Sequence, residues 1–253
     1  MDINLLLKKT IERGASDLHL KVGNLPIVRV DGRLVPLEDQ QKITQEDAIA
    51  TAFAIMSNSN KQRFKEKSEA DFAYSASGLG RFRVNVFQQR GTIGIVMRAV
   101  PTKILSIDDL NLPKVLEKLS MEQRGLILVT GTTGCGKTTT LASMIDFMNA
   151  NRSDNIITIE DPIEYLHRDK KSLVSQREVG NDTESFGLAL RSALRQDPDV
   201  ILVGEMRDFE TISTALVAAE TGHLVLSTLH TIDAAETINR IISVYPPYQQ
   251  KQV

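Results

Sequence analysis

Residues 125–140 decide the fold of this chain, and they read Gly-Leu-Ile-Leu-Val-Thr-Gly-Thr-Thr-Gly-Cys-Gly-Lys-Thr-Thr-Thr. Within this stretch, residues 131–138 fit the pattern G-x-x-x-x-G-K-[S/T] of a phosphate-binding loop at every fixed position. The apolar run at 126–129 predicts a buried parallel strand, and a helical pattern of apolar residues opens at Lys137. Strand, glycine-rich loop and helix thus follow one another in the order that such a loop requires.

The chemistry of the loop follows from its residue types. Its glycines let the backbone curl so that successive N–H groups face inward, and the helix that follows adds its positive end, so an anion fits there. Lys137 would reach the β- and γ-phosphates of a nucleotide, and the hydroxyl of Thr138 would ligate a bridging Mg²⁺. The residues expected to contact the nucleotide are Gly131, Thr132, Thr133, Gly134, Cys135, Gly136, Lys137, Thr138 and Thr139. A glycine-rich turn without a ligand is the alternative, but it does not account for the strand and helix on either side.

Composition places the chain among ordinary globular proteins. It has 253 residues, 42% of them hydrophobic, which suffices for one large or two modest domains. Thirty basic and 32 acidic side chains give a net charge of −2, so no global basic field favours nucleic acid or anionic lipid as the main partner. The single cysteine excludes a disulfide within the chain and suits a reducing compartment. Because no apolar run approaches the roughly 20 residues that cross a bilayer, we expect a cytoplasmic protein without a transmembrane segment.

Residues 1–100 predict an α+β module. The Asp31-Gly32 pair is a strong two-residue hairpin signal, and Thr44 is placed to cap a helix. Helices are expected over 3–13 and 44–57, a charged helix end or loop over 61–67, and strands over 16–22, 26–37, 71–75, 81–88 and 92–100. Residues 101–124, punctuated by two prolines, are expected to form a linker.

From residue 125 onward the pattern changes to an α/β domain. Short apolar runs at 126–129, 156–159, 200–203 and 224–227 alternate with helical patterns near 137–150, 184–195, 208–220 and 233–243. This alternation predicts a parallel sheet with helices on both faces.

Acidic residues follow two of the predicted strands, at the edge of the sheet where ligands gather. Glu160, Asp161 and Glu164 come after the strand at 156–159, and the other reading of this stretch is a plain acidic turn. After the strand at 200–203, Gly204 stands where many phosphate-loop ATPases have an aspartate, and Glu205 follows it. We therefore expect Glu205 to act on the attacking water or on Mg²⁺, and Glu160 or Glu164 to supply the missing acid.

Histidines and arginines are further candidates for the site. His230 follows the strand at 224–227 and His223 precedes it, so either could sense the γ-phosphate or be purely structural. Phosphoryl transfer needs a cation near the developing charge, often from a neighbouring subunit. The candidates are Arg81, Arg83 and Arg98 in the first part of the chain and Arg191, Arg195 and Arg207 in the second, each of which could instead be solvated or ion-paired.

With these segments assembled, the chain resembles the secretion ATPases of type II secretion and type IV pilus systems. The segments that carry the resemblance are 14–20, 80–85, the phosphate loop, 158–164 as an aspartate box, 201–207 as an atypical Walker B motif, and 221–231 as a histidine box. Residues 241–250, Ile-Ile-Ser-Val-Tyr-Pro-Pro-Tyr-Gln-Gln, are similar to the retraction branch of the family. The four-cysteine zinc motif that is usual in the assembly branch does not occur in this sequence.

The resemblance implies a fold and a mechanism. It implies a PAS-like domain at 1–100, the linker at 101–124, and a RecA-like core at 125–253, assembled as a homo-hexamer that binds ATP and Mg²⁺ at subunit boundaries. Glu205 and the aspartate-box glutamates would serve hydrolysis, and Arg81, Arg83 or Arg98 would reach a neighbour's nucleotide.

The resemblance also implies partners. The motor would turn a pilus platform protein at the inner face of the inner membrane and pull pilin subunits out of the fibre, with a paralogous motor ATPase as a further candidate partner. Relatives continue with a helical C-terminal region carrying an Ala-Ile-Arg-Ala-Gly-Glu motif. The resemblance therefore implies either a shortened form or a chain that does not retract pili by itself.

Two other functions remain open at this point. A non-hydrolysing, nucleotide-binding regulatory subunit is disfavoured by the intact Lys137, Thr138 and Glu205 and favoured by the short C-terminus. A RecA-like nucleic-acid motor is disfavoured by the near-neutral charge and by the lack of an aromatic stacking stretch, so we expect no nucleic-acid partner.

Overall fold

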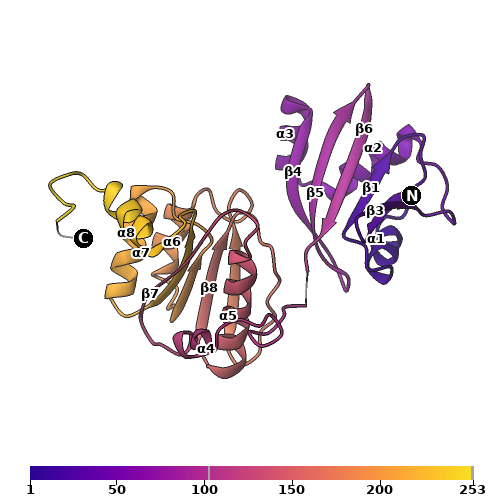
Figure 1. Cartoon of the computed structure of the whole chain (residues 1–253). Coiled ribbons are helices and arrows are strands. Elements are labelled where there is room, and N and C mark those ends of the chain that lie inside the picture. Colours follow the sequence, from indigo (N-terminus) through magenta and orange to yellow (C-terminus); the bar gives the residue numbers. More distant parts are fainter. Residues whose placement is uncertain (102, 252–253) are drawn as a thin grey trace. The chain divides into compact units, whose positions relative to one another are not determined.

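The computed structural model describes residues 1–101 and 103–251, and the chain divides into two compact units, Met1–Val100 and Pro101–Val253 (Figure 1). The sequence predicts a linker at 101–124. In the structure these residues belong to the second unit, where Leu116 and Leu119 of helix α4 (Val115–Ser120) pack against the apolar cluster beneath helix α5 (Lys137–Asn151).

The first unit is built on a six-stranded antiparallel sheet with the strand order β3-β2-β1-β6-β5-β4. Its elements are α1 (Ile3–Glu12), β1 (Asp17–Lys21), β2 (Ile27–Val30), β3 (Arg33–Pro36), α2 (Gln45–Ile55), α3 (Asn58–Lys67), β4 (Glu69–Ala76), β5 (Gly80–Gln89) and β6 (Thr92–Ala99). Asp31 and Gly32 join β2 to β3 with φ values of 46° and 78°, as a tight hairpin turn requires. Thr44 caps α2 in a reciprocal capping box with Asp47.

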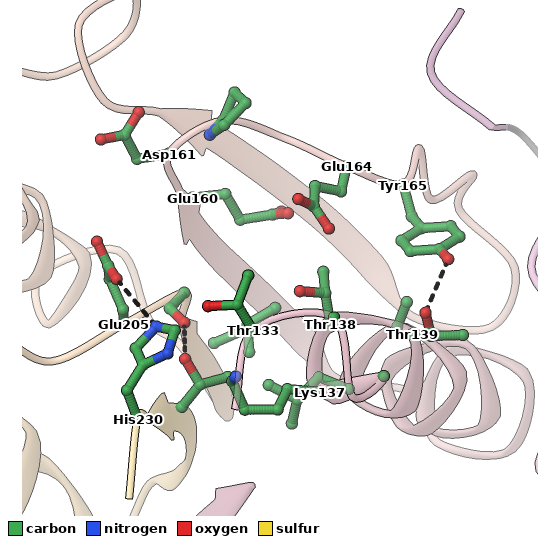
Figure 2. Close-up of a pocket in the computed structure, with 18 of the residues that line it drawn as sticks. Thr133, Lys137, Thr138, Thr139, Glu160, Asp161, Glu164, Tyr165, Glu205 and His230 are labelled. Carbon is green, nitrogen blue, oxygen red and sulfur yellow. Dashed lines mark hydrogen bonds and ion pairs between the residues drawn. The ribbon is translucent and has the colours of Figure 1, made fainter. Parts of the chain in front are cut away.

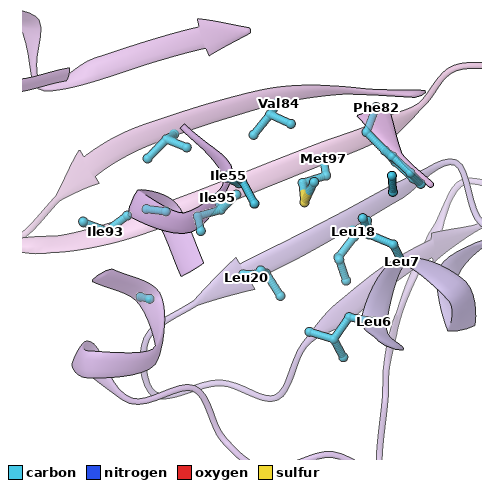
Figure 3. Close-up of a cluster of buried hydrophobic side chains, with 14 of the residues drawn as sticks. Leu6, Leu7, Leu18, Leu20, Ile55, Phe82, Val84, Ile93, Ile95 and Met97 are labelled. Carbon is cyan, nitrogen blue, oxygen red and sulfur yellow. The ribbon is translucent and has the colours of Figure 1, made fainter. Parts of the chain in front are cut away.

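The core of the first unit lies where α1 and α2 meet the inner side of the sheet. Apolar side chains from α1, β1, α2, β5 and β6 gather there in one cluster (Figure 3). Its largest buried members include Leu6, Leu7, Leu18, Phe82 and Met97. Residues 61–67 are not the end of the preceding helix, because Ser57 caps a separate helix α3 by accepting a hydrogen bond from the backbone N–H of Asn60 at 3.2 Å.

The second unit is built on a five-stranded parallel sheet with the order β7-β11-β10-β8-β9. Besides α4 and α5, its elements are β7 (Gly125–Thr130), β8 (Asn155–Glu160), β9 (Leu173–Glu178), α6 (Phe186–Ala193), β10 (Val200–Val203), α7 (Phe209–Glu220), β11 (Leu224–Leu229) and α8 (Ala234–Ser243). The sequence does not predict β9. Among the described strands, β9 pairs with β8 alone, and after Leu173 and Val174 its residues are polar, so it lacks the apolar run that marks its neighbours.

Both faces of the parallel sheet are covered, as the sequence predicts. Helix α5 packs on one face, where its apolar side chains meet Ile156, Val200 and Leu226. Helices α6 and α7 pack on the other face against Ile157, Ile201 and their neighbours. Buried apolar residues therefore alternate between two clusters along each inner strand, which is the arrangement of a doubly covered parallel sheet.

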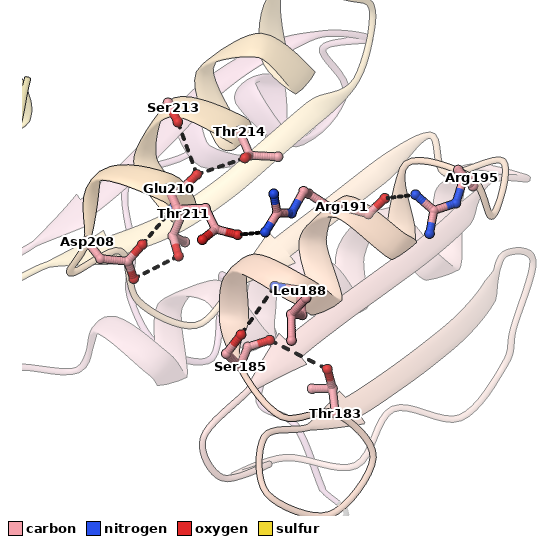
Figure 4. Close-up of polar contacts among 10 residues, drawn as sticks. All are labelled: Thr183, Ser185, Leu188, Arg191, Arg195, Asp208, Glu210, Thr211, Ser213 and Thr214. Carbon is pink, nitrogen blue, oxygen red and sulfur yellow. Dashed lines mark hydrogen bonds and ion pairs between the residues drawn. The ribbon is translucent and has the colours of Figure 1, made fainter.

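Polar contacts fix the two helices on the second face (Figure 4). Ser185 caps α6 by accepting from the backbone N–H of Leu188, and Asp208 caps α7 by accepting from the backbone N–H of Thr211. Between the helices, the guanidinium of Arg191 pairs with the carboxylate of Glu210. Arg191 is thus engaged as an ion-paired residue between α6 and α7.

Register brings the carboxyl ends of the inner strands to one level. Val203 of β10 pairs with Ile159 of β8 on one side and with Ser227 of β11 on the other. The residues that follow these strands therefore emerge at the same edge of the sheet as the phosphate loop, which follows β7. In a parallel sheet this edge is where ligands bind.

Candidate active site

The phosphate loop has the backbone that its glycines allow. Gly131, Gly134 and Gly136 have φ values of 144°, 79° and 96°, which L-residues with a side chain rarely adopt. Lys137 is buried, and its Nζ donates hydrogen bonds to the carbonyl oxygens of Gly131 at 2.8 Å and Thr132 at 2.9 Å. The two hydrogen bonds therefore hold the loop backbone curved around the ammonium group of Lys137.

A cleft of about 500 Å³ opens above this loop (Figure 2). That volume lies in the range of small-molecule sites. The predicted residues that line the cleft are Thr133, Gly134, Gly136, Lys137, Thr138, Thr139, Glu160, Glu164, Glu205 and His230. The other predicted loop residues stand behind the lining: Gly131 and Thr132 hold Lys137 through their carbonyls, and Cys135 is exposed.

Glu160 is the buried carboxylate of the cleft. Glu160 is only 8% exposed. Its Oε1 accepts hydrogen bonds from Thr158 Oγ1 at 2.6 Å and from Gln176 Nε2 at 3.0 Å. Burial raises the pKa of Glu160, and the two hydrogen bonds oppose that rise without cancelling it. A carboxyl group with a raised pKa in a cleft is suited to exchanging a proton.

The loop after β8 carries further polar groups to the cleft. Asp161 and Glu164 are exposed and line it (Figure 2). The hydroxyl of Tyr165 lies 3.0 Å from Thr139 Oγ1 and so links this loop to the first turn of α5. The acidic residues after β8 therefore stand across from the phosphate loop, as the sequence predicts.

Glu205 follows β10, and its Oε2 lies 2.8 Å from Arg207 Nε and 3.9 Å from His230 Nε2. The glycine before it has a steric reason. A Cβ at position 204 would lie 3.2 Å from the carbonyl oxygen of Ile159 and 3.4 Å from Cα of Glu160. Close approach of the two strand ends thus favours glycine where many phosphate-loop ATPases have an aspartate.

One predicted residue of the second unit, His223, does not line the cleft. His223 precedes β11, at the opposite end of the strand from the cleft, and its Nδ1 lies 3.0 Å from the carbonyl oxygen of Ala218. Arg81, Arg83 and Arg98 lie on strands β5 and β6 of the first unit. Arg98 Nε donates to the buried carboxylate of Asp17 at 2.8 Å.

The structure also adds residues that sequence reasoning assigned no role. Tyr165, His167 and Phe186 line the cleft, and Gln176 bonds to Glu160 from β9. Burial lowers the pKa of His167 to about 4, which keeps its imidazole neutral at ordinary pH. No motif marks these positions. Only the pairing of β9 with β8 reveals Gln176.

The donor set fits a Mg²⁺–nucleotide complex. Inward backbone N–H groups and a buried ammonium are suited to phosphate. The exposed hydroxyl of Thr138 and the carboxylates of Glu160, Glu164 and Glu205 are hard oxygen ligands of the kind that Mg²⁺ prefers. Within residues 1–101 and 103–251, no cluster of three or more His, Cys, Asp or Glu is placed to hold a metal by protein ligands alone.

Comparisons with known proteins point to one family. The family model described as type II/IV secretion system protein matches residues 1–245. The chain is 50% identical over 258 residues to the type IV pilus retractation ATPase PilT of Pseudomonas aeruginosa, covering 100% of this chain and 73% of PilT. It is 44% identical over 253 residues to the type IV pilus ATPase PilU of the same bacterium, covering 100% of this chain and 66% of PilU.

A solved structure gives the same result. A crystal structure of the pilus retraction motor PilT with bound ADP matches with a TM-score of 0.91 and 52% identity, over 100% of this chain and 74% of that one. The match confirms the predicted α/β fold, a RecA-like phosphate-loop core preceded by a smaller α+β domain. It also confirms the resemblance to the retraction branch.

Proposed function

The chain belongs to the family of type II/IV secretion system proteins and stands among the ATPases of that family; from this membership we propose that it is an ATP-hydrolysing motor subunit that powers type IV pilus retraction. One observation carries the chemical part of the proposal. Lys137 of the phosphate loop, Glu160 at the end of β8 and Glu205 after β10 line the same cleft at the carboxyl edge of the parallel sheet.

Each of these residues has a role that its position supports. The loop N–H groups, with Lys137 once released from its own carbonyls, would bind the β- and γ-phosphates. Thr138 would ligate Mg²⁺, which when bound neutralises charge on the phosphates. Glu205 would orient the attacking water and take up its proton. Glu160 and Glu164 would supply the acidic group that Gly204 cannot.

The proposal extends to assembly and partners. The named relatives are pilus motors, so we propose a homo-hexamer that completes each nucleotide site with an arginine from the first unit of a neighbour, from among Arg81, Arg83 and Arg98. A platform protein at the inner face of the inner membrane would receive the motion. Within the described residues, no helix has both the length and the apolar character to cross a bilayer.

Steady-state ATP hydrolysis, measured over a range of protein concentrations with and without Mg²⁺, tests this function. We expect specific activity to rise with protein concentration, because the site is completed between subunits, and to vanish in Lys137→Ala. Lys171→Ala is the matched control, since Lys171 is exposed on the same unit and its backbone N–H, which the substitution keeps, donates to the carbonyl oxygen of Asn149. ATP binding without turnover at any concentration would contradict the motor and favour a non-hydrolysing regulatory subunit.

A further inference from the structure

The side chain of Gln176 forms a three-way junction beneath the cleft. Its Nε2 donates to Glu160 Oε1 at 3.0 Å and to the carbonyl oxygen of Tyr165 at 2.9 Å. Its Oε1 accepts from the backbone N–H of His167 at 2.8 Å. One amide group thus joins the buried carboxylate of the site to two points of the loop that follows β8.

The register of β9 explains why Gln176 reaches this place. Gln176 pairs with Thr158 of β8, and Thr158 Oγ1 donates to the same Glu160 Oε1 at 2.6 Å. Two donors from paired positions on neighbouring strands therefore converge on one carboxylate oxygen. A buried carboxylate fixed in this way keeps a single orientation toward the cleft.

A second residue of β9 acts on the same loop. Glu178, two positions further along the strand, is buried, and its Oε2 accepts from the backbone N–H of Ile163 at 3.1 Å. Side chains two residues apart on a strand point to the same face. β9 therefore holds the loop at Ile163, Tyr165 and His167, on both sides of Glu164.

We infer that Gln176 is a positioning residue for hydrolysis, which aligns Glu160 and the loop bearing Glu164 and Tyr165 with the phosphate loop. The inference rests on the proposed ATPase function. Gln176 does not line the cleft, so it acts through Glu160 and the loop and has no contact with substrate in this role. Tyr165 connects this loop to the phosphate-binding side of the cleft, because its hydroxyl lies 3.0 Å from Thr139 Oγ1 at the start of α5.

Two substitutions of similar shape separate the parts of the junction. Gln176→Met keeps the length of the side chain and removes all three hydrogen bonds. Gln176→Glu keeps an acceptor for the N–H of His167 but removes both donated hydrogen bonds, to Glu160 and to the carbonyl oxygen of Tyr165, and adds a like charge beside Glu160. Ser175→Ala is the matched control, because Ser175 is the neighbouring residue of β9 and is exposed. The measurements are kcat, KM and ADP affinity for the full chain, with amide hydrogen exchange of residues 161–167.

A misaligned site should lose turnover before it loses binding. We expect Gln176→Met and Gln176→Glu each to lower kcat by about 10- to 100-fold, the cost of misplacing a reacting group by about 1 Å. ADP affinity should stay within about threefold of the parent chain, because the phosphate loop is untouched. Exchange over 161–167 should rise most in Gln176→Met, while Ser175→Ala should match the parent chain in every measurement.

Each outcome bears on the inference. A kcat within about twofold of the parent in both Gln176 variants would overturn it. Full activity in Gln176→Glu alone would overturn the part that assigns a role to the two hydrogen bonds donated to Glu160 and to Tyr165. If the parent chain itself shows no turnover, the proposed function fails, and the exchange data then decide by themselves whether Gln176 positions the loop: unchanged exchange in Gln176→Met overturns that as well.

Discussion

Arg207 Nε lies 2.8 Å from Oε2 of Glu205, so the carboxylate that follows β10 is paired with an arginine whose side chain is 75% exposed. The pair orients Glu205 at the mouth of the cleft. Glu205→Gln removes the base without changing its size, and we expect kcat to fall by at least about 100-fold, the upper part of what general-base catalysis supplies. ADP affinity should be nearly unchanged. Parallel measurements of ATP turnover and of ADP titration check this.

Arg207→Gln is the control for the pair itself. Because the guanidinium is largely in solvent, the pair should contribute no more than about 1 kcal/mol to the free energy of unfolding. A large loss of stability in Arg207→Gln would contradict the small contribution of this pair, and full turnover in Glu205→Gln would contradict the assignment of Glu205 as the base.

Gly131 is irreplaceable for two separate reasons. Its φ is 144°, and a Cβ there would lie 2.6 Å from Cys135 Sγ. We expect Gly131→Ala to lose most ADP binding, measured by fluorescence titration. Adding Cys135→Ala should not restore binding, because relieving the clash leaves the backbone strain of about 1–3 kcal/mol in place. Cys135→Ser alone should bind like the parent, and a restored double variant would show that the side-chain clash alone matters.

Arg98 of β6 and Arg83 of β5 occupy paired positions on neighbouring strands. Arg98 donates a hydrogen bond to the carboxylate of Asp17. Burial favours a raised pKa for Asp17, yet hydrogen bonds from Ser16 and Arg98 outweigh it and hold the pKa below its usual value. Arg98→Ala leaves this carboxylate without its main cation and should lower the free energy of unfolding by about 1–3 kcal/mol. Arg83→Ala removes a like charge and should leave stability unchanged or slightly higher.

Chemical denaturation of both variants checks this difference. If Arg98→Ala lost ATP turnover with full stability, Arg98 would act on a neighbour's nucleotide and not mainly as a partner of Asp17. Equal stability losses in the two variants would contradict the assignment of Arg98 as the main cation of Asp17.

His167 should make stability depend on pH. Burial lowers its pKa from 6.5 to about 4 in the folded chain, with Lys170 adding to the effect and Asp146 opposing it. Between these values the unfolded chain binds a proton that the folded chain does not, so stability falls as pH falls from about 6.5 to about 4. The loss from this residue is at most about 3 kcal/mol.

Urea unfolding at pH 7.5, 6 and 5 of the parent chain and of His167→Gln measures this contribution. The parent should lose stability more steeply than the variant as the pH falls. Curves that run parallel would show that His167 takes up its proton equally well when folded.

The sequence predicts those parts of the fold that depend on residues close together along the chain. The phosphate loop, the inner strands and the helices on both faces appear as predicted, because apolar runs and helical periodicity are local signals. Glu160, Glu164 and Glu205 are brought to the cleft because carboxyl ends of parallel strands share one edge.

Other features depend on tertiary contacts and leave no local signal. β9 is an edge strand of mixed polarity, so neither the strand nor the junction formed by Gln176 is visible in the sequence. The sequence could not tell His230 and His223 apart, but the structure does. His230 lines the cleft, whereas the ring of His223 contacts the carbonyl oxygen of Ala218 before β11.

The strand order predicts that different parts of the site unfold at different temperatures. Among the described residues, β7 and β9 are the outermost strands of the parallel sheet. The phosphate loop follows β7, and Gln176 lies on β9, so the two parts of the site depend on opposite edges of the sheet. Outer strands fray before inner ones. Partial melting of β7 would loosen the phosphate loop, and melting of β9 would free Glu160 and the loop bearing Glu164 from Gln176, while β8, β10 and β11 stay folded. Nucleotide retention and turnover would therefore fail at separate temperatures, both below the cooperative collapse of the sheet.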